Sequence, residues 1–236
     1  MAYTALTELL KGNAYAGRGI MIGRTQDGKQ AVVVYFIMGR SENSRNRVFK
    51  EEGEGITIYP FDASKVKDPS LIIYSPIRTL ENRLVVTNGD QTDTICDYLS
   101  EGLSFEAALR TRTYEPDDPN FTPRISGMVE FDGGEFAYSL SVLKKQAAGS
   151  DCCTRQTFEY CGVPGQGHFV HTYVHDGDPL PSFAGEPEMV AVPNDTAAFA
   201  KDVWEALNAE NKISLCVKGV DLKTGETKTY LFNKNV

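Results

Sequence analysis

Residues Ala31–Met38 read Ala-Val-Val-Val-Tyr-Phe-Ile-Met, a run in which the tyrosine carries the one polar group. A strand with one face in water would alternate apolar and polar residues, and this run does not alternate. It is also far shorter than the roughly 20 apolar residues that span a bilayer. The run therefore predicts a β-strand that is buried on both faces, inside a layered protein.

Strand pairs and helices alternate on both sides of this run. Asp27-Gly28 is a strong hairpin signal between the run and a strand predicted at Gly19–Gly23. Other strands are predicted at residues 55–59, 71–77, 83–87, 124–131, 135–142, 154–160, 168–174, 213–220 and 227–232. Helices are predicted at 5–11, 92–99, 104–112 and 196–209, with Ser104 and Asn194 as caps. Many hairpins with few helices indicate an α+β fold of stacked, mainly antiparallel sheets covered by helices.

Length and composition narrow the class of protein further. The 236 residues show no linker and no repeat, so we expect a single domain over 1–236, with 1–14 as an N-terminal helical extension. The net charge of -8 disfavours nucleic acid and anionic membrane surfaces as partners. Five irregularly spaced cysteines argue against a disulfide framework. No signal-peptide pattern is present at the N-terminus, and we expect a cytoplasmic protein.

An arginine-rich loop follows the buried run directly. Gly39–Arg47 contains Arg40, Arg45 and Arg47 together with serines and asparagines. The guanidinium group is a rigid fork of donors that matches phosphate and carboxylate oxygens, so the loop suits a small anion. The alternative is a solvated loop whose arginines pair with acidic side chains. Its position at the end of a core strand favours the binding site.

Three more segments carry polar groups that allow both a functional and a purely structural interpretation. Thr87–Thr94 is a strand-to-helix junction that could bind an anion through free N–H groups, although Asp90 or Thr92 could simply cap the helix. Glu115 stands in an acidic loop and could act as general acid or base, or be merely solvated. Tyr74 has apolar neighbours, which is more typical of a core tyrosine than of a catalytic phenol.

The second half of the chain holds all three histidines and four of the five cysteines. His171 and His175 have a spacing that zinc sites use, but Cys152, Cys153 and Cys161 do not. In a strand, His168 and His171 would point to opposite faces. The spacing therefore predicts no metal site, with the cysteines as small core residues and the histidines on a surface hairpin.

Five segments in this order resemble the archaeal-type IMP cyclohydrolase family over Tyr15–Ile125, about half the chain. They begin with Tyr15-Ala16-Gly17-Arg18 and the Gly39–Arg47 loop. They continue with Asp68-Pro69 through Tyr74 to Ile77-Arg78, with Thr87-Asn88-Gly89 through Thr92-Asp93-Thr94-Ile95, and with Tyr114-Glu115 through Thr122-Pro123-Arg124-Ile125. Each motif alone is weakly specific, and the ordered set carries the resemblance.

The resemblance implies a fold and a reaction. The fold would be the four-layer αββα sandwich of N-terminal-nucleophile hydrolases, used without an N-terminal nucleophile. The reaction would close the purine ring of 5-formamidoimidazole-4-carboxamide ribonucleotide, giving IMP and water, without metal or cofactor. A small purine nucleotide would be the partner. Exposed sheet edges would also favour a homo-oligomer.

The resemblance also implies roles for individual residues. Tyr74 and Glu115 would handle protons, and Arg45 or Arg47 would polarise an oxygen of the substrate. Substrate binding would fall to Arg18, Arg40, Ser41, Asn88, Thr92, Asp93, Thr94, Thr122 and Arg124. The arginine loop is longer than the family's by about two residues, so Arg45 and Arg47 compete for one role. Two other functions stay open: a catalytically inactive nucleotide sensor or scaffold, and an amidohydrolase that cleaves itself to expose a nucleophile.

Overall fold

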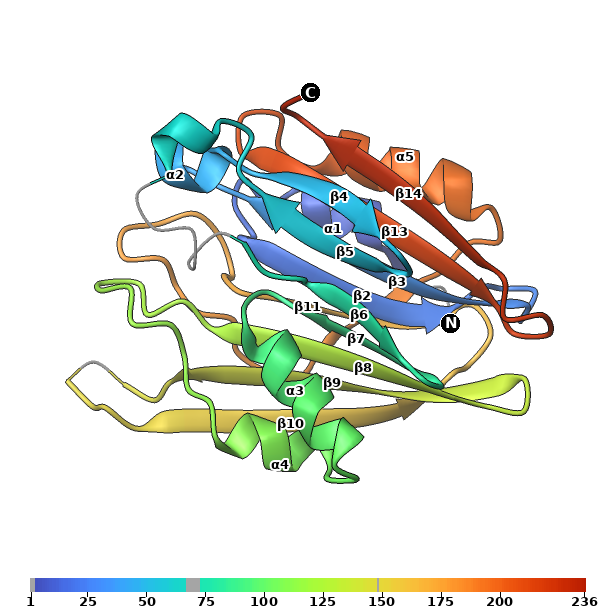
Figure 1. The fold of residues 1–236 in the computed structure, drawn as a ribbon. Helices are drawn as coiled ribbons and strands as arrows, with labels where there is room; N and C mark the ends of the chain where they lie inside the picture. The colour runs from blue at the N-terminus through green and yellow to red at the C-terminus, as the bar shows by residue number, and fades with distance from the viewer. Residues whose placement is uncertain (1–2, 67–72, 148) are drawn as a thin grey trace.

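The computed structural model describes residues 3–66, 73–147 and 149–236 and contains two seven-stranded sheets (Figure 1). The strand order of the first sheet is β1-β12-β11-β2-β3-β13-β14. Its strands are β1 (Thr4–Ala5), β12 (Glu188–Ala191), β11 (Gln166–His171), β2 (Arg18–Arg24), β3 (Gln30–Met38), β13 (Lys212–Asp221) and β14 (Thr227–Asn233). Neighbouring strands are antiparallel except for β1 and β12, which run parallel.

The second sheet is antiparallel throughout its described pairings, in the order β10-β9-β8-β7-β6-β5-β4. Its strands are β10 (Cys153–Cys161), β9 (Glu135–Lys145), β8 (Arg124–Asp132), β7 (Arg83–Thr87), β6 (Ile77–Leu80), β5 (Gly55–Tyr59) and β4 (Val48–Glu52). The protein is thus α+β with mostly antiparallel sheets, as the hairpin-rich sequence predicts.

Strand β3 is buried on both faces, which confirms the prediction from its unbroken apolar run. Tyr35 and its alternate neighbours face the core between the two sheets. Phe36 and the other alternate residues face a second core on the opposite side of the first sheet. Because both faces need apolar side chains, the period-two alternation of a half-exposed strand is missing.

Helices cover the outer faces of both sheets (Figure 1). Helices α1 (Leu6–Lys11) and α5 (Thr196–Ala206) pack on the first sheet through leucines, Phe199 and Val203. Helices α3 (Gln91–Ser100) and α4 (Phe105–Arg110) pack on the second sheet through Ile95, Leu99 and Phe105. Residues 4–11 therefore pair with and pack against the first sheet and its helices, whereas residues 1–14 were predicted as an N-terminal helical extension.

Several local expectations are wrong. The Gly39–Arg47 segment is not all loop, because Ser41 caps a short helix, α2 (Glu42–Arg45). Of the strand predicted at 71–77, residues 73–76 are not in a strand and β6 starts at Ile77, while residues 67–72, with the Asp68-Pro69 motif, lie outside the described residues. The short strands β1, β4 and β12 were not predicted, and a 3₁₀ turn (Ala63–Lys65) follows β5.

The predicted helix caps also differ in part. Ser104 accepts a hydrogen bond from the Ala107 N–H and caps α4 as expected. Asn194 does not cap α5, because Asp195 does so and the Asn194 side chain instead binds the backbone N–H of Asp27. At α3 the N-cap residue is Asp90, but its carboxylate makes no capping hydrogen bond.

Candidate active site

The polar motifs of the first half of the chain meet at one end of the sandwich. Arg18 begins β2, Arg47 precedes β4, and Tyr74 precedes β6. Asn88 directly follows β7 at the junction with α3. Glu115 lies in the segment between α4 and β8. The antiparallel registers bring the start of β2 to the end of β3, and the end of β7 to the start of β8. Both sheets therefore contribute side chains to one site.

Gly17 sets the position of Arg18. Its φ of +77° is a conformation that glycine adopts readily, and a Cβ there would lie 2.1 Å from the Thr172 hydroxyl. The Arg18 N–H in turn donates to the same hydroxyl at 3.1 Å. The Tyr15–Arg18 motif is thus fixed against the chain near Tyr173, and Arg18 enters the site from the start of β2.

Arg47 is buried, with 8% of its surface exposed. Its neighbour Asn46 anchors the chain, because the side-chain amide donates to the Asp62 carbonyl and accepts from the Asp62 N–H. Burial, followed by the positive charge of Arg18, lowers the pKa of Arg47. The buried Nε atoms of Arg18 and Arg47 have no hydrogen-bond partner in the described part of the chain. Two cations with unused donors thus face the same site.

The remaining arginines of the loop lie elsewhere. Arg45 is exposed, and its Nε donates to the Gly39 carbonyl at 3.0 Å while Nη2 contacts Asn211. Arg40 pairs with Asp176 at 2.7 Å and lies over the ring of Tyr15 at 5.1 Å. Both line a surface groove of about 410 Å³ that also includes Lys65.

Ser41 is committed to local structure. Its hydroxyl accepts from the Ser44 N–H at the start of α2 and lies 3.0 Å from the Ser44 hydroxyl. The side chain is therefore used to begin the short helix that separates Arg40 from Arg47.

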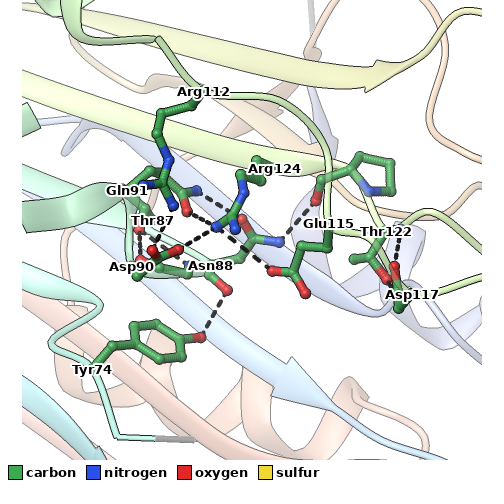
Figure 2. Close-up of polar contacts among 12 residues, drawn as sticks. Tyr74, Thr87, Asn88, Asp90, Gln91, Arg112, Glu115, Asp117, Thr122 and Arg124 are labelled. Carbon is green, nitrogen blue, oxygen red and sulfur yellow. Dashed lines mark hydrogen bonds and ion pairs between the residues drawn. The ribbon is translucent and has the colours of Figure 1, made fainter. Parts of the chain in front are cut away.

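Tyr74 lies with its hydroxyl inside the site (Figure 2). The hydroxyl donates to the Asn88 carbonyl at 2.8 Å and lies 3.3 Å from the Tyr35 hydroxyl. Burial raises the pKa of Tyr74, and the charges of Arg47 and Arg18 oppose that shift. Tyr74 is accordingly a neutral phenol at neutral pH, with a proton that two cations make easier to release.

Glu115 faces the same space from the segment before β8 (Figure 2). Its side chain is 31% exposed, and its carboxylate lies 3.8 Å from Arg124 Nη1. Burial raises the pKa of Glu115, against the lowering effects of Arg124 and Arg18. A carboxylate whose pKa lies above its usual range is a stronger proton acceptor than an ordinary one.

The β7–α3 junction is held by a buried hydrogen-bond network (Figure 2). The Asn88 amide donates to the Pro123 carbonyl at 2.9 Å and accepts from the Ile125 N–H at 2.9 Å. The Thr92 hydroxyl lies 2.7 Å from the Thr87 hydroxyl. Asn88 and Thr92 are thus engaged in internal bonds, and what the junction presents to the site is the Asn88 carbonyl.

Other predicted binding residues are spread around this network. Asp93 pairs with Arg78 at 2.7 Å on the surface, and Thr94 accepts a long hydrogen bond of 3.4 Å from Arg112. Thr122 is buried between Asp117 and the Tyr173 hydroxyl. The contacts of these side chains are thus with Arg78, Arg112, Asp117 and Tyr173, and not with Tyr74, in the described part of the chain.

Three residues that were not predicted as site residues, Tyr35, Asp90 and Gln91, also contribute to the site. Tyr35 is the one polar residue in the buried run, which was the available signal, and its hydroxyl meets Tyr74. Asp90 binds Arg124 at 2.7 Å and also Arg112 (Figure 2). Gln91 binds Arg124 at 2.6 Å. Because their partners come from distant segments, no local motif could have identified Asp90 or Gln91 as supports of Arg124.

Comparison with known proteins bears on this arrangement. Residues 15–225 match the protein family described as IMP cyclohydrolase-like protein. The chain belongs to that family. A curated relative named IMP cyclohydrolase, from Methanosphaera stadtmanae, is 31% identical over 214 residues, covering 81% of this chain and 96% of the relative.

Two further relatives of the same name match over shorter stretches. The one from Methanopyrus kandleri is 37% identical over 116 residues, 48% of this chain and 57% of the relative. The one from Methanococcus aeolicus is 34% identical over 128 residues, 52% of this chain and 62% of the relative. In these two cases the match thus spans less than two thirds of the relative's length. The family match nevertheless includes every site residue named above.

The cysteine and histidine segment, Cys152–His175, contacts the site residues through Thr172, which binds the Arg18 N–H, and Tyr173, which binds Thr122. His168 stacks on Tyr160 between the sheets, and His171 lies 3.3 Å from Glu188, so the two point to opposite faces as predicted. Across the described residues, no group of three or more His, Cys, Asp or Glu side chains is placed to hold a metal ion. In the same part of the chain, none of the helices combines the length and apolar character required for crossing a membrane.

Proposed function

We propose that this protein is an IMP cyclohydrolase, which closes the purine ring of 5-formamidoimidazole-4-carboxamide ribonucleotide to give IMP and water. The observation that carries the proposal is that four separate segments bring Arg18 and Arg47, each with a buried and unpaired Nε, within range of the charges of Tyr74 and Glu115. Family membership and relatives named IMP cyclohydrolase support it. We further propose one domain, a cytoplasmic location, and the four-layer αββα sandwich of N-terminal-nucleophile hydrolases.

The reaction needs three things from the protein. The carboxamide nitrogen attacks the formyl carbon within one molecule, so the substrate must be held in a reactive conformer. Negative charge develops on the formyl oxygen as the C–N bond forms, and it must be stabilised. Protons must leave the nitrogen and reach the oxygen that departs as water. No external nucleophile takes part, so no N-terminal Cys, Ser or Thr is required.

The side chains match these needs. The unpaired Nε donors of Arg47 and Arg18 would stabilise the oxygen that gains charge. Glu115, with its raised pKa, would take a proton from the attacking nitrogen. Tyr74, held by the Asn88 carbonyl, would donate a proton toward the departing oxygen. We propose Arg47 for the catalytic role, because Arg45 is bonded to Gly39 and Asn211 at the surface.

In this proposal, the phosphate and the ribose are bound by residues at the edge of the site. Arg40 is exposed and pairs with Asp176, so a phosphate there would replace an exposed carboxylate as its partner. Arg124 would stay with Asp90 and Gln91, and would contact the base or ribose through its remaining donors. No metal ion or cofactor takes part in the proposed steps.

The test is ultraviolet absorbance during incubation of the purified protein with the formylated ribonucleotide, with EDTA present. IMP should form, and Tyr74→Phe and Glu115→Gln should each lower kcat about 10²–10⁴-fold, the usual range for a lost general acid or base. The matched controls are Tyr59→Phe and Glu101→Gln, which change a tyrosine bonded to Glu52 and an exposed glutamate. They should keep full activity.

Other outcomes would reject the proposal or decide between its alternatives. No IMP above the spontaneous background would reject the proposal, and tight IMP binding without turnover would favour a nucleotide sensor. An intact mass matching the uncut chain, apart from removal of Met1, would exclude a self-cleaving amidohydrolase.

A further inference from the structure

Strand β10 forms an open edge of the second sheet (Figure 1). It pairs with β9 along all nine residues, Cys153–Cys161, without a register shift, and no described strand lies on its other side. Natural proteins usually guard such edges with proline, charged side chains and above all lysine, a bulge or a very short strand. The β10 sequence, CTRQTFEYC, contains no proline, glycine or lysine.

The other sheet edges are guarded. At β4 the side-chain amide of Asn233 accepts from the Phe49 N–H at 2.8 Å and donates to the Phe49 carbonyl at 3.1 Å. Strand β1 has only two residues, and β14 carries Lys228. The open edge of β10 is therefore different from the others in the described part of the protein.

The pairing with β9 shows which backbone groups of β10 point outward. Flanking β10, Gln146 N–H donates to the Cys152 carbonyl, and Gly162 N–H donates to the Phe136 carbonyl. In an antiparallel ladder this places the even-numbered residues in hydrogen-bonded pairs with β9. The N–H and C=O groups of the odd-numbered residues then face the open edge. These odd-numbered residues are Cys153, Arg155, Thr157, Glu159 and Cys161.

The edge is self-complementary in charge. When a second copy of β10 is laid antiparallel about Thr157, Arg155 lies directly opposite Glu159 of the second copy, and the reverse pair forms as well. Both side chains are exposed. Arg155 donates only to the carbonyl oxygens of Cys153 and Arg112, which do not neutralise its charge. Directly opposite residues of opposite charge stabilise a strand pair.

Other registers are worse by the same criterion. Centring the pair on residue 155 would place two arginines opposite each other, and centring it on residue 159 would do the same with two glutamates. The register centred on Thr157 also sets the half-buried Phe158 beside Gln156 of the second copy, which would remove apolar surface from water.

We propose that this surface binds a second copy of the chain, with β10 pairing antiparallel to β10 about a two-fold axis at Thr157. The sheet that contains β10 in one copy then continues into the same sheet of the other copy. The active site is built from other segments, so this inference does not depend on the proposed function.

The first test measures mass in solution by light scattering after size exclusion, at micromolar concentrations. The wild-type protein should have twice the chain mass of 26.0 kDa. Glu159→Arg should weaken association roughly tenfold or more, because both cross-strand pairs become repulsive. The double variant Arg155→Glu with Glu159→Arg should restore the dimer. Glu226→Arg, in the exposed turn between β13 and β14, is the matched control.

The second test fixes the register. In a chain with Cys152, Cys153 and Cys161 changed to serine, Thr157→Cys should be linked to its own copy by a short bismaleimide, whereas Thr224→Cys should not. A monomeric wild-type protein would overturn the proposal. So would a dimer that Glu159→Arg leaves intact, a charge swap that restores nothing, or no cross-link at position 157.

Discussion

At the scale of single residues, the site is defined by the guanidinium groups of Arg18 and Arg47, whose Nε atoms are buried and whose charges act on each other. Arg47 is held inward because Asn46 is anchored to Asp62 on the neighbouring segment. Arg45 is turned outward by the short helix that Ser41 begins. The sequence places both arginines in one polar loop and offers no local signal that separates them, because the anchoring partner lies sixteen residues further on.

Arg47→Gln should therefore reduce kcat far more than Arg45→Gln. Removing a single donor that stabilises developing negative charge typically costs about 10²–10³-fold. Arg45 contacts a carbonyl and an asparagine at the surface, so its loss should change kcat by less than about threefold. Steady-state kinetics on both variants checks this, and equal losses would place the catalytic role outside Arg47.

Glu115 links the chemistry to stability. Its pKa is raised in the folded protein, so above the ordinary carboxyl pKa of 4.5 the folded state keeps a proton that the unfolded state has lost. Stability then falls as the pH rises through the window between 4.5 and the raised value. Glu115→Gln should thus raise Tm at pH 8, because the glutamine avoids the cost of ionising a partly buried carboxyl group.

The same comparison at pH 4 is the control for Glu115→Gln. There the carboxyl is protonated in both states, and the difference in Tm should disappear. A variant that is less stable than the wild type at pH 8 would show that the ionised carboxylate is stabilised by Arg124, against the direction inferred here.

At the scale of elements, the β7–α3 junction is the support on which the site is built. Gly89 sits where a Cβ would lie 2.5 Å from Arg124 Nη1 and 3.2 Å from a carboxylate oxygen of Glu115. A methyl group there must displace one of these side chains. Gly89→Ala should therefore lower kcat by about tenfold or more with little change in secondary structure, because small misplacements in a site are costly.

Gly12→Ala is the matched control for that substitution. A Cβ at Gly12 would meet only backbone oxygens at 3.8 Å and beyond, so activity should be unchanged. Circular dichroism of both variants checks that the fold is kept. Wild-type kinetics for Gly89→Ala would mean that Arg124 and Glu115 can move without consequence.

The elements themselves were predictable where the signal is local. Hairpin turns and the apolar run located β2, β3, β5 and β7 almost to the residue. The short strands β1, β4 and β12 were missed, because a strand of two to five residues carries no clear periodicity and depends on partners distant in sequence. The relative placement of the site residues was out of reach for the same reason, and only the family resemblance indicated that they meet.

At the scale of the whole molecule, the N-terminal residues belong to the packed layers. Leu6 is fully buried with Phe199 and Val203 of α5. Leu6→Ala should lower the free energy of unfolding by about 2–5 kcal/mol, the usual cost of a large-to-small core substitution. Urea unfolding measures this, with the exposed Glu8→Ala at the same helix expected to cost less than about 0.5 kcal/mol. Equal effects would show that residues 4–11 are dispensable for the core.

The like charges of Arg18 and Arg47 should make the stability of the fold depend on a bound anion. An anion bound between them would act as the missing counter-ion, and a ligand at a hundred times its Kd adds about 2.7 kcal/mol to stability. Saturating IMP should accordingly raise Tm, and an unchanged Tm would count against this coupling. The ligand-free protein is then the form that opens most often to proteases, so its lifetime would lengthen when this anion is plentiful and shorten when it is scarce.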